Sequence, residues 1–582
     1  MKGVRTLNNK LFTKTGGVMS RNHYVVLFLV FTVILSGFAF GQSVLSLATY
    51  NGDPSTELMT QIIADTTANH GILPDRVYEL EGGGLYICQQ LFYVEDQYTL
   101  RLRSSNDQKA IIYLYPSGSG SSPQNPPGYF VRLRGGDLEM SGIALSGYFE
   151  PLDSNFNNIQ GGMIRTDVEG SNIILDNCIF SNTAGQVIRC EASTATIKVT
   201  NCIFTNLGAL STSNFGAGKG IDLRASSLDS LILVNNTWTN YQDRVVRHYN
   251  FSNPLEGTGN IGYTLIDHNT MYNGMGFHGL LSMGNIGSKI IITNNLFKDA
   301  FSLGEDSTDA TRAAEWANTG EFYPNGNSRI VWIFSSPNDT SEWVISNNYY
   351  AISDSGQAFF DDFTQYPIVE GSPLSWHINS RLGADSVNAF TKIDDPMLTN
   401  TQVLMTNLMR WYESPSGGDR KKNTPCTCWD PATDDMDRQP LDFWENTLDA
   451  SYSESSPAYT GSEGGFPAGD LNWFPTKKAE WEVWLTDVDE PSTQPSRYVL
   501  NQNYPNPFNP STKISFVLGE SGLTKLSIYN VLGQKVATLF EKELSVGYHE
   551  YKFDASSLSS GIYFYRLESG KYSAVHKMML LK

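Results

Sequence analysis

The sequence predicts an all-β protein in which a right-handed parallel β-helix is followed by a small antiparallel β-sandwich. Composition is the first reason, because 51 glycines and only 17% charged residues are typical of turn-rich β proteins. The second reason is an asparagine that recurs through the middle of the chain and is followed by alternating apolar residues. The third is a strand-like alternation of apolar and polar residues after residue 490. At 582 residues, the chain is too long for one compact core.

Residues 1–41 have the order expected of a signal peptide. They contain five basic and no acidic residues, then the apolar run from Tyr24 to Phe40, then small residues before Gln42. A transmembrane anchor is the alternative, but the run is short for a bilayer. We therefore expect cleavage and no membrane span in the mature chain.

The charge and the cysteines narrow the function classes. The chain has 41 basic and 60 acidic residues, a net charge of −19, and no basic run, so nucleic-acid binding is not expected. The six cysteines lack a Cys-x-x-Cys spacing, so no metal site is expected through sulfur. No cofactor is expected, and a bound calcium ion has no support in the sequence.

The predicted β-helix covers residues 42–400. The recurring asparagines are Asn177, Asn201, Asn236, Asn269, Asn295 and Asn348, at intervals of 24, 35, 33, 26 and 53 residues. Two intervals are near the length of one solenoid coil, and the others resemble a coil with an insertion. Asparagine tolerates left-handed backbone geometry in a tight turn, and its amide can bond its counterpart in the next coil. Residues 296–345 are expected to hold a missed coil or a lateral loop.

Cys178 and Cys202 follow two of these asparagines and fall one coil apart. With Cys190 they predict a stack of buried thiols, because stacked neighbours in a parallel ladder are poorly placed for a disulfide. A disulfide remains the alternative in an exported protein.

A second strand in each coil carries the candidate site. Ile164 and Ile188 both lie 13 residues before their asparagine, which aligns the strands that follow them. The pattern predicts two outward columns of side chains, Arg165, Arg189, Asp222, Arg247 and His278 in one and Asp167, Glu191, Arg224, Tyr249 and Leu280 in the other. Arginines on adjacent coils could bind the carboxylates or sulfates of an acidic polysaccharide. Alternatively, arginine–carboxylate pairs only hold stacked strands in register.

Whether the predicted site is catalytic stays open at this point, and no catalytic residue is assigned. A polysaccharide lyase needs a base that removes the proton next to the substrate's carboxylate, and a positive group to stabilise the resulting charge. A glycoside hydrolase needs two carboxyl groups, one of them protonated. Asp167 and Glu191 fit that role poorly, because the neighbouring arginines would keep both ionised. A lyase is therefore favoured over a hydrolase, with a non-catalytic surface, matrix or adhesion protein as the alternative.

The coil pattern, over about residues 70–400, resembles the pectate-lyase-like β-helix superfamily. The resemblance implies the fold but not the activity, because that superfamily includes lyases, hydrolases and adhesins. Residues 401–490 are expected to form an acidic closing segment and linker. Within them, Ser455–Ala458, Gly464–Pro467 and Gly469–Trp473 look like the closing segment of secreted β-helix proteins, which implies a cap over the last open strand edge.

Residues 491–582 carry the more specific resemblance. Their motifs are Asn503–Pro510, Thr512–Phe516, Leu526–Asn530, Gly533–Val536, Gly547–His549 and Ser560–Tyr565. Together they resemble the type A sorting domain of type IX secretion, and their alternation predicts a β-sandwich. The resemblance implies recognition by an outer-membrane translocon and a location outside the cell or on its outer surface. An ordinary adhesion module is the alternative.

Overall fold

The computed structural model divides the chain into two compact units, residues 1–482 and 483–582, which are described separately. The described residues are 42–117, 127–147, 160–208, 218–248, 259–275, 280–283, 285–301, 331–332, 341–362, 381–402, 404, 406, 409–410, 414–416, 429–430, 435–436, 448–486, 499–500, 503, 506, 508–518, 522–531, 533–544, 547–570 and 572–582. The expected signal peptide, residues 1–41, lies outside them. Within the described part, no helix is both long and apolar enough to cross a membrane.

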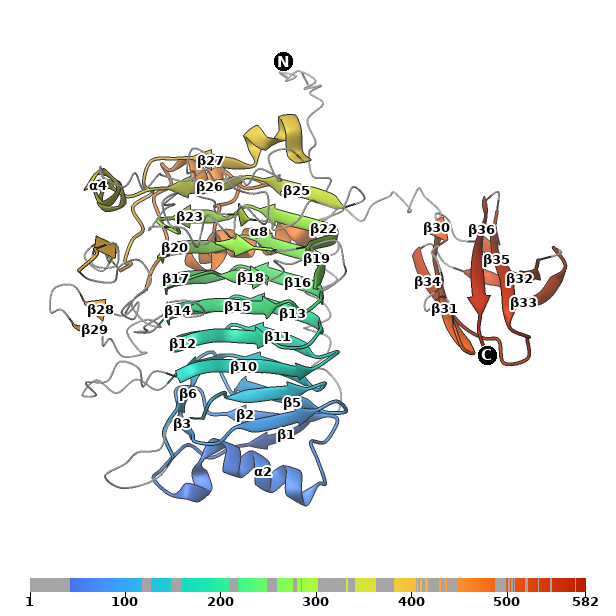
Figure 1. The fold of residues 1–582 in the computed structure, drawn as a ribbon, viewed down its shortest axis with the longest axis horizontal. Helices are drawn as coiled ribbons and strands as arrows, with labels where there is room; N and C mark the ends of the chain where they lie inside the picture. Colours follow the sequence, from blue (N-terminus) through green and yellow to red (C-terminus); the bar gives the residue numbers. More distant parts are fainter. Residues whose placement is uncertain are drawn as a thin grey trace, which may run out of the picture. The chain divides into compact units, whose positions relative to one another are not determined.

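The first unit is a parallel β-helix whose coils stack into three ladders of strands (Figure 1). The first ladder pairs ten strands in parallel. They are β1 (Ser43–Ser46), β2 (Arg76–Leu80), β5 (Thr99–Ser104), β8 (Asp137–Ser141), β11 (Asn172–Asp176), β13 (Thr194–Thr200), β16 (Leu228–Val234), β19 (Asn260–Asp267), β22 (Asn285–Thr293) and β25 (Glu342–Ser346).

The other two ladders belong to one 17-stranded sheet that bends between them. The second ladder contains β3 (Leu85–Cys88), β6 (Ala110–Leu114), β9 (Ile143–Ser146), the start of β12 (Ile179–Cys190), β14 (Ile203–Leu207), β17 (Thr237–Tyr241), β20 (Thr270–Gly274), β23 (Leu296–Lys298), β26 (Asn348–Ala351) and β27 (Phe390–Lys392). The third ladder contains β4 (Phe92–Glu95), β7 (Val131–Arg134), β10 (Gln160–Val168), the end of β12, β15 (Lys219–Arg224), β18 (Val246–His248), β21 (Leu281–Ser282) and β24 (Val331–Trp332). The segment 296–345 therefore contributes the third strand of its own coil through β24.

The core consists of inward side chains that repeat from coil to coil. In β5, Leu100 and Leu102 are buried, as the alternation predicts, whereas Arg101 lies outward and pairs with Glu139. In the second ladder, Phe204 stacks on Phe180 with ring centroids 5.0 Å apart and on Trp238 at 3.7 Å. Burial of these repeating columns is the main stabilising contribution, because each coil alone could not cover its apolar side.

The turns between the first and second ladders confirm the predicted turn positions Asn177 and Asn201 but show that the predicted alignment is one residue out in the four later coils. The residues with left-handed backbone are Asn177, Asn201, Asn235, His268, Asn294 and Asn347. The position after each turn residue points inward and holds Cys178, Cys202, Asn236, Asn269, Asn295 and Asn348. An Asn-Asn pair can be aligned on either member, and only the backbone angles distinguish the two.

The inward position forms the predicted ladder of amides. The Asn269 side-chain oxygen accepts from the Asn236 backbone N–H at 3.1 Å, and Asn295 serves Asn269 in the same way at 2.9 Å. The Asn269 amide nitrogen also donates to the Leu233 carbonyl at 3.0 Å. Each amide thus satisfies buried backbone groups that would otherwise lack a partner.

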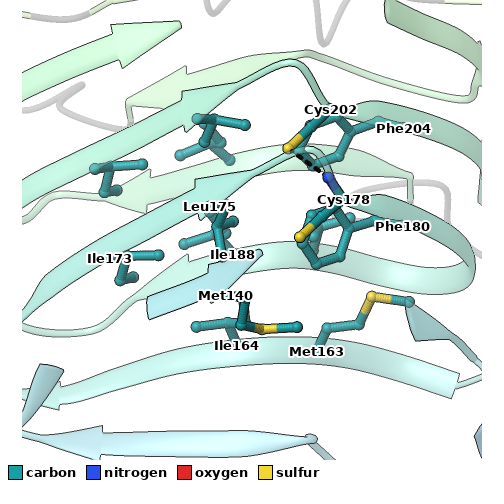
Figure 2. Packing of buried hydrophobic residues seen from close by; sticks show 14 of the residues in the cluster. Met140, Met163, Ile164, Ile173, Leu175, Cys178, Phe180, Ile188, Cys202 and Phe204 are labelled. Carbon is teal, nitrogen blue, oxygen red and sulfur yellow. Dashed lines mark hydrogen bonds between the residues drawn. The ribbon is translucent and has the colours of Figure 1, made fainter. Parts of the chain in front are cut away.

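In two coils, cysteine takes the place of asparagine at this inward position. Figure 2 shows Cys178 and Cys202 stacked one above the other, with the Cys202 sulfur accepting from the Cys178 backbone N–H at 3.3 Å. Both are free and buried, as are Cys88 and Cys190, so the structure agrees with buried thiols rather than a disulfide. Cys190, which was predicted to join the stack, instead lies in the third ladder opposite Thr166. Cys426 and Cys428 lie outside the described residues.

A helix that the sequence reading did not anticipate covers the first coil. Helix α2 (Leu58–Ala68) lies below β1 in Figure 1 and buries Leu58, Met59 and Ile62. The Glu57 carboxylate begins the helix by accepting from the Thr60 backbone N–H at 2.6 Å. The remaining short elements of this unit are η1 (Pro54–Thr56), α4 (Asp354–Asp362), η3 (Gly383–Asn388), β28 (Trp429–Asp430), β29 (Asp435–Met436), η4 (Pro457–Thr460), η5 (Leu471–Trp473) and α8 (Pro475–Thr486), of which α8 continues past the unit boundary.

The second unit has the predicted antiparallel strands in two sheets. One sheet has the order β30 (Val499–Leu500), β31 (Ser511–Leu518) and β34 (Gly547–Asp554). The other has the order β33 (Lys535–Leu544), β32 (Gly522–Asn530), β35 (Gly561–Ser569) and β36 (Tyr572–Leu580). Their inner faces share one core, which includes Ile514, Phe516, Leu526, Ile528 and Tyr565. The predicted fold class, all-β with a parallel β-helix and a C-terminal antiparallel region, is confirmed.

Candidate functional site

The outward column of the third ladder contains four of the five residues predicted for it. Strand pairing aligns Arg165 with Arg189, Arg189 with Asp222, and Asp222 with Arg247. In the next coil, however, Ser282 stands opposite Arg247, in the place expected for His278. His278 itself lies outside the described residues. The prediction missed this register because the few residues between β20 (Thr270–Gly274) and β21 (Leu281–Ser282) carry no sequence pattern that fixes where the next strand begins.

The same column extends upstream to residues that the sequence reading missed. Arg132 pairs with Arg165 in register, and Tyr93 pairs with Arg132. The signal was available, because Val131-Arg132 repeats the apolar–arginine order of Ile164-Arg165 and Ile188-Arg189. The column therefore begins two coils earlier than the aligned asparagines indicate.

Arg224 lies next to this column, at a point where the strand pairing is irregular. The ladder shifts register between Asp222 and Arg224, and Arg224 has left-handed backbone with φ 54°. Its backbone N–H donates to the Asp222 carboxylate at 3.2 Å. This geometry brings the Arg224 Nε within 3.9 Å of Glu191.

Carboxylates in the neighbouring column are each shared by two arginines. Asp167 accepts from the Arg132 Nε at 2.7 Å and from the Arg165 Nε at 2.8 Å. Glu191 accepts from the Arg189 Nε at 2.5 Å and faces Arg224 on its other side. Each group of two guanidiniums and one carboxylate thus keeps one net positive charge. Such part-exposed pairs also help align adjacent coils, with a contribution of about 0 to 1 kcal/mol each.

Two tyrosine rings flank the arginines in the first coils of this face. The Arg134 guanidinium lies 3.8 Å from the Tyr93 ring centroid, and Arg165 lies 5.7 Å from that of Tyr129. The Tyr129 ring can lie against β10 because Gly162 has no side chain, and an added Cβ would come within 2.5 Å of it. We name the surface formed by Tyr93, Tyr129 and the outward arginines 132, 165 and 189 the Arg–Tyr face.

The far part of the column is more buried and is paired internally. The Asp222 carboxylate is fully buried and accepts from the Arg247 guanidinium at 3.0 Å. Burial lowers the pKa of neighbouring His248 to about 4, and its Nε2 lies 3.1 Å from the Ser226 carbonyl. His248 is therefore a neutral core histidine near pH 7.

A buried charged cluster that the sequence did not reveal lies at the bend into the third ladder. The Lys219 ammonium is 2.7 Å from the Asp243 carboxylate, and the Arg244 Nε is 3.3 Å from it. Burial lowers the pKa of Lys219, with Asp243 opposing that shift. A lysine with a lowered pKa is a weaker base than an ordinary lysine, but a larger fraction of it is neutral near pH 7 and so available to take up a proton.

The flank segment, residues 448–482, lies along the side of the solenoid, whereas the sequence reading expected a cap over its last coil. Its contacts with the coils run from Gly461 to Lys478. The Gly461 carbonyl accepts from the Tyr349 hydroxyl at 3.2 Å, and the Lys478 ammonium donates to the Asn201 side-chain oxygen at 2.9 Å. Its contacts with the left-handed turn residues are Glu463 N to Asn294 Oδ1, 3.2 Å; Ser462 Oγ to His268 Nε2, 3.3 Å; Leu471 N to Asn235 Oδ1, 3.3 Å; and Lys478 Nζ to Asn201 Oδ1, 2.9 Å. The turn asparagines thus attach this segment to the coils.

One contact in this row has the residue types of a hydrolytic triad. Asp267 lies 2.7 Å from His268 Nδ1, and Ser462 Oγ lies 3.3 Å from His268 Nε2. The arrangement does not activate the serine, because its hydroxyl donates to the Phe466 carbonyl at 2.8 Å. His268 is also fully buried, with the Trp481 ring 5.2 Å away. We therefore assign these residues to attachment of the flank segment.

Metal-ligand side chains do not gather on the part of the chain that the structure describes. No group of three or more His, Cys, Asp or Glu residues there is arranged to hold a metal ion.

In the second unit, the Asn-Pro-rich motif protects the edge of β36. Asn506 accepts from the Met579 backbone N–H at 2.8 Å, and the Phe508 backbone bonds both Met579 and Leu581 at 2.9 Å. Covering an edge strand in this way prevents unwanted pairing with other chains. Residues 502–581 match the family described as the secretion system C-terminal sorting domain.

This sorting domain shows where the protein is delivered. The protein is secreted to the extracellular space or attached to the outer cell surface, and it interacts with the type IX secretion machinery. The match does not reach into the β-helix. No curated protein matches the chain.

Proposed function

We propose that the Arg–Tyr face binds an acidic polysaccharide outside the cell. The observation that carries this proposal is the sharing of Asp167 and Glu191, each between two arginines. A purely structural register would be served by equal numbers of both charges, as in the Arg101–Glu139 pair of the first ladder. The excess positive charge is notable on a chain with a net charge of −19, and it favours an anionic ligand.

The spacing of the coils suits a polymer. Parallel strands repeat at about 4.8 Å, so an extended chain lying along the ladder would meet one guanidinium per coil. Arg165 and Arg189 each use the Nε edge for an internal carboxylate, so their terminal nitrogens are the donors for a carboxylate or sulfate. Tyr93 and Tyr129 add flat apolar faces against which sugar rings can pack.

Binding is the proposed function, and cleavage by elimination is a further possibility at the same face. Elimination needs a base, and Lys219 is the candidate because its pKa is lowered and it lies at the bend preceding Asp222. A non-catalytic surface or adhesion protein is the second candidate. It is favoured by the burial of Lys219, whose side chain is only 2% exposed and already pairs with Asp243.

A binding titration with a matched control tests the proposal. Purified mature protein would be titrated with pectate, alginate and chondroitin sulfate, with neutral dextran for comparison. Arg165→Ala removes a charge-assisted contact of about 1.5–3 kcal/mol, so affinity should fall about 10- to 100-fold. Arg101→Ala is the control, since its side chain has similar exposure, 22% against 27%, and also pairs with one carboxylate.

The outcomes are distinct. Weaker binding at higher salt is expected, because exposed charges are screened within about 8 Å at physiological ionic strength. Equal affinity of the Arg165 and Arg101 variants, or equal affinity for dextran, would refute an anionic site. For cleavage, the same polymers would be followed for unsaturated products by absorbance. If none of these polymers yields unsaturated products although the protein still binds them, the result supports the non-catalytic candidate.

A further inference from the structure

The two outer faces of the sorting domain differ in character. The outer face of the β31–β34 pair exposes charged side chains, Lys513, Lys552 and Asp554. On the outer face of the four-stranded sheet, Tyr529 instead pairs across strands with Phe564, and Arg566 pairs with Val575. Val575 is 53% exposed. The outer face of the four-stranded sheet thus combines exposed apolar side chains with charged pairs such as Lys525–Glu541 and Arg566–Glu568.

These outward residues form a groove of about 310 Å³. We name it the sorting-domain groove, and it is lined by Tyr529, Asn530, Val531, Gly533, Phe564, Arg566 and Val575. Val531 is 64% exposed at the turn that joins β32 to β33. Reciprocal bonds between Asn530 and Gln534 hold that turn, and Gly533 supplies its left-handed backbone at φ 74°. The groove is therefore formed before any partner arrives, which lowers the entropic cost of binding.

Folding of the sandwich does not account for these apolar side chains. In the same two strands, Ile528 and Tyr565 are fully buried and belong to the core. Tyr529 and Phe564 are their immediate neighbours in sequence and point to the opposite side. Exposed apolar side chains that gather around one groove with a charged residue at its rim are a feature of protein–protein interaction sites.

We propose that the sorting-domain groove is the surface through which the type IX secretion machinery binds this protein. The occupant is a protein surface of that machinery that offers an apolar side chain beside a carboxylate. The apolar side chain would fill the space between Tyr529, Phe564 and Val575. The carboxylate would approach Arg566, whose guanidinium is held at the rim by Glu568 at 3.1 Å and by Ser573 at 2.9 Å.

The test measures export of the full chain from a bacterium that carries this secretion system. Val531→Asp combined with Val575→Asp places two charges in the groove without touching the core. Leu523→Asp is the matched control, because Leu523 is 55% exposed on β32 and lies outside the groove lining. We expect at least a tenfold loss of extracellular and surface protein for the groove variant, with accumulation in the periplasm. The control should be exported like the original chain.

Folding and self-association are separated by two further measurements. Thermal unfolding of each purified variant reports whether the domain is intact. If the double variant melts early, Val531→Ser at the turn tip replaces it, with the same expected loss of export. Export of an intact groove variant at the level of the control would overturn the proposal. Unchanged export together with altered sedimentation would overturn it in favour of a second copy of this chain as the occupant.

Discussion

Replacing Asn269 with alanine tests whether the inward amides hold the coils together. The Asn269 side chain accepts from the Asn236 backbone N–H at 3.1 Å and from the Asn236 amide at 2.9 Å. It donates to the Leu233 carbonyl at 3.0 Å and to Asn295 at 3.0 Å. Asn269→Ala removes these four bonds and a fifth, to the Asp267 carbonyl at 3.1 Å, and it leaves buried polar groups such as the Asn236 backbone N–H without this acceptor. An unsatisfied buried group costs about 1–3 kcal/mol, so with two such groups we expect a loss of about 2–6 kcal/mol.

Urea unfolding of the mature protein measures this loss, and hydrogen exchange locates it. The Asn236 backbone N–H should exchange much faster in the variant, because the oxygen that accepts from it is gone. Asn106→Ala is the control, since Asn106 is exposed and its side chain bonds only locally, to the Gln108 N–H at 2.8 Å. A surface change of this kind is usually within about 0.5 kcal/mol. If Asn269→Ala lowers the free energy of unfolding no more than Asn106→Ala does, the inward amides do not stabilise the coils and the reasoning is wrong.

Three further predictions follow from other buried groups. Burial raises the pKa of Asp470 in the flank segment from 3.8 to about 6. The protonated carboxyl therefore stabilises the folded state fully below about pH 3.8, and this stabilisation is lost as the pH rises through about 6. The urea midpoint should therefore fall across that window, and Asp470→Asn should remove the fall; a slope unchanged in the variant would contradict this assignment. Phe204→Ala should cost about 3–5 kcal/mol in urea unfolding, because the ring is stacked on both faces, and a cost below about 1 kcal/mol would mean that the column collapses to fill the space. The four buried thiols should resist a thiol reagent in the folded protein and all react after unfolding without reductant, whereas a disulfide among them would leave two silent until reduction.

Much of the fold was accessible from sequence because the coil repeats in register. The alternation around Leu100 and Leu102 and the 24-residue interval from Asn177 to Asn201 identify strands and turns directly. The one-residue error at the Asn-Asn pairs has a physical origin. Both positions favour asparagine, one for its left-handed backbone and the other for its amide bonds, so composition alone cannot separate them.

The candidate site was only partly predictable for a related reason. Arg165 and Arg189 align because their coils have no insertion between strand and turn. Arg132 was missed because the turn that follows β8 in its coil has Gly142 in the left-handed position, so that coil offers no asparagine to align, although the register places Arg132 beside Arg165. The cluster around Lys219 depends on the bend between two ladders, and no local pattern encodes a bend. The same holds for the shared carboxylates, which emerge only when two columns lie side by side.

The path of the flank segment has a consequence for how the protein assembles. Its bonds to the turn residues join positions that are more than 150 residues apart in the chain, such as Ser462 with His268 and Lys478 with Asn201. Contacts of such high sequence separation are costly to form early, because the closure entropy of a long loop comes before any gain. The row of turn asparagines exists as a docking line only after several coils have stacked. We therefore expect the flank segment to dock late in folding and, once docked, to link neighbouring coils so that they unfold together rather than one at a time.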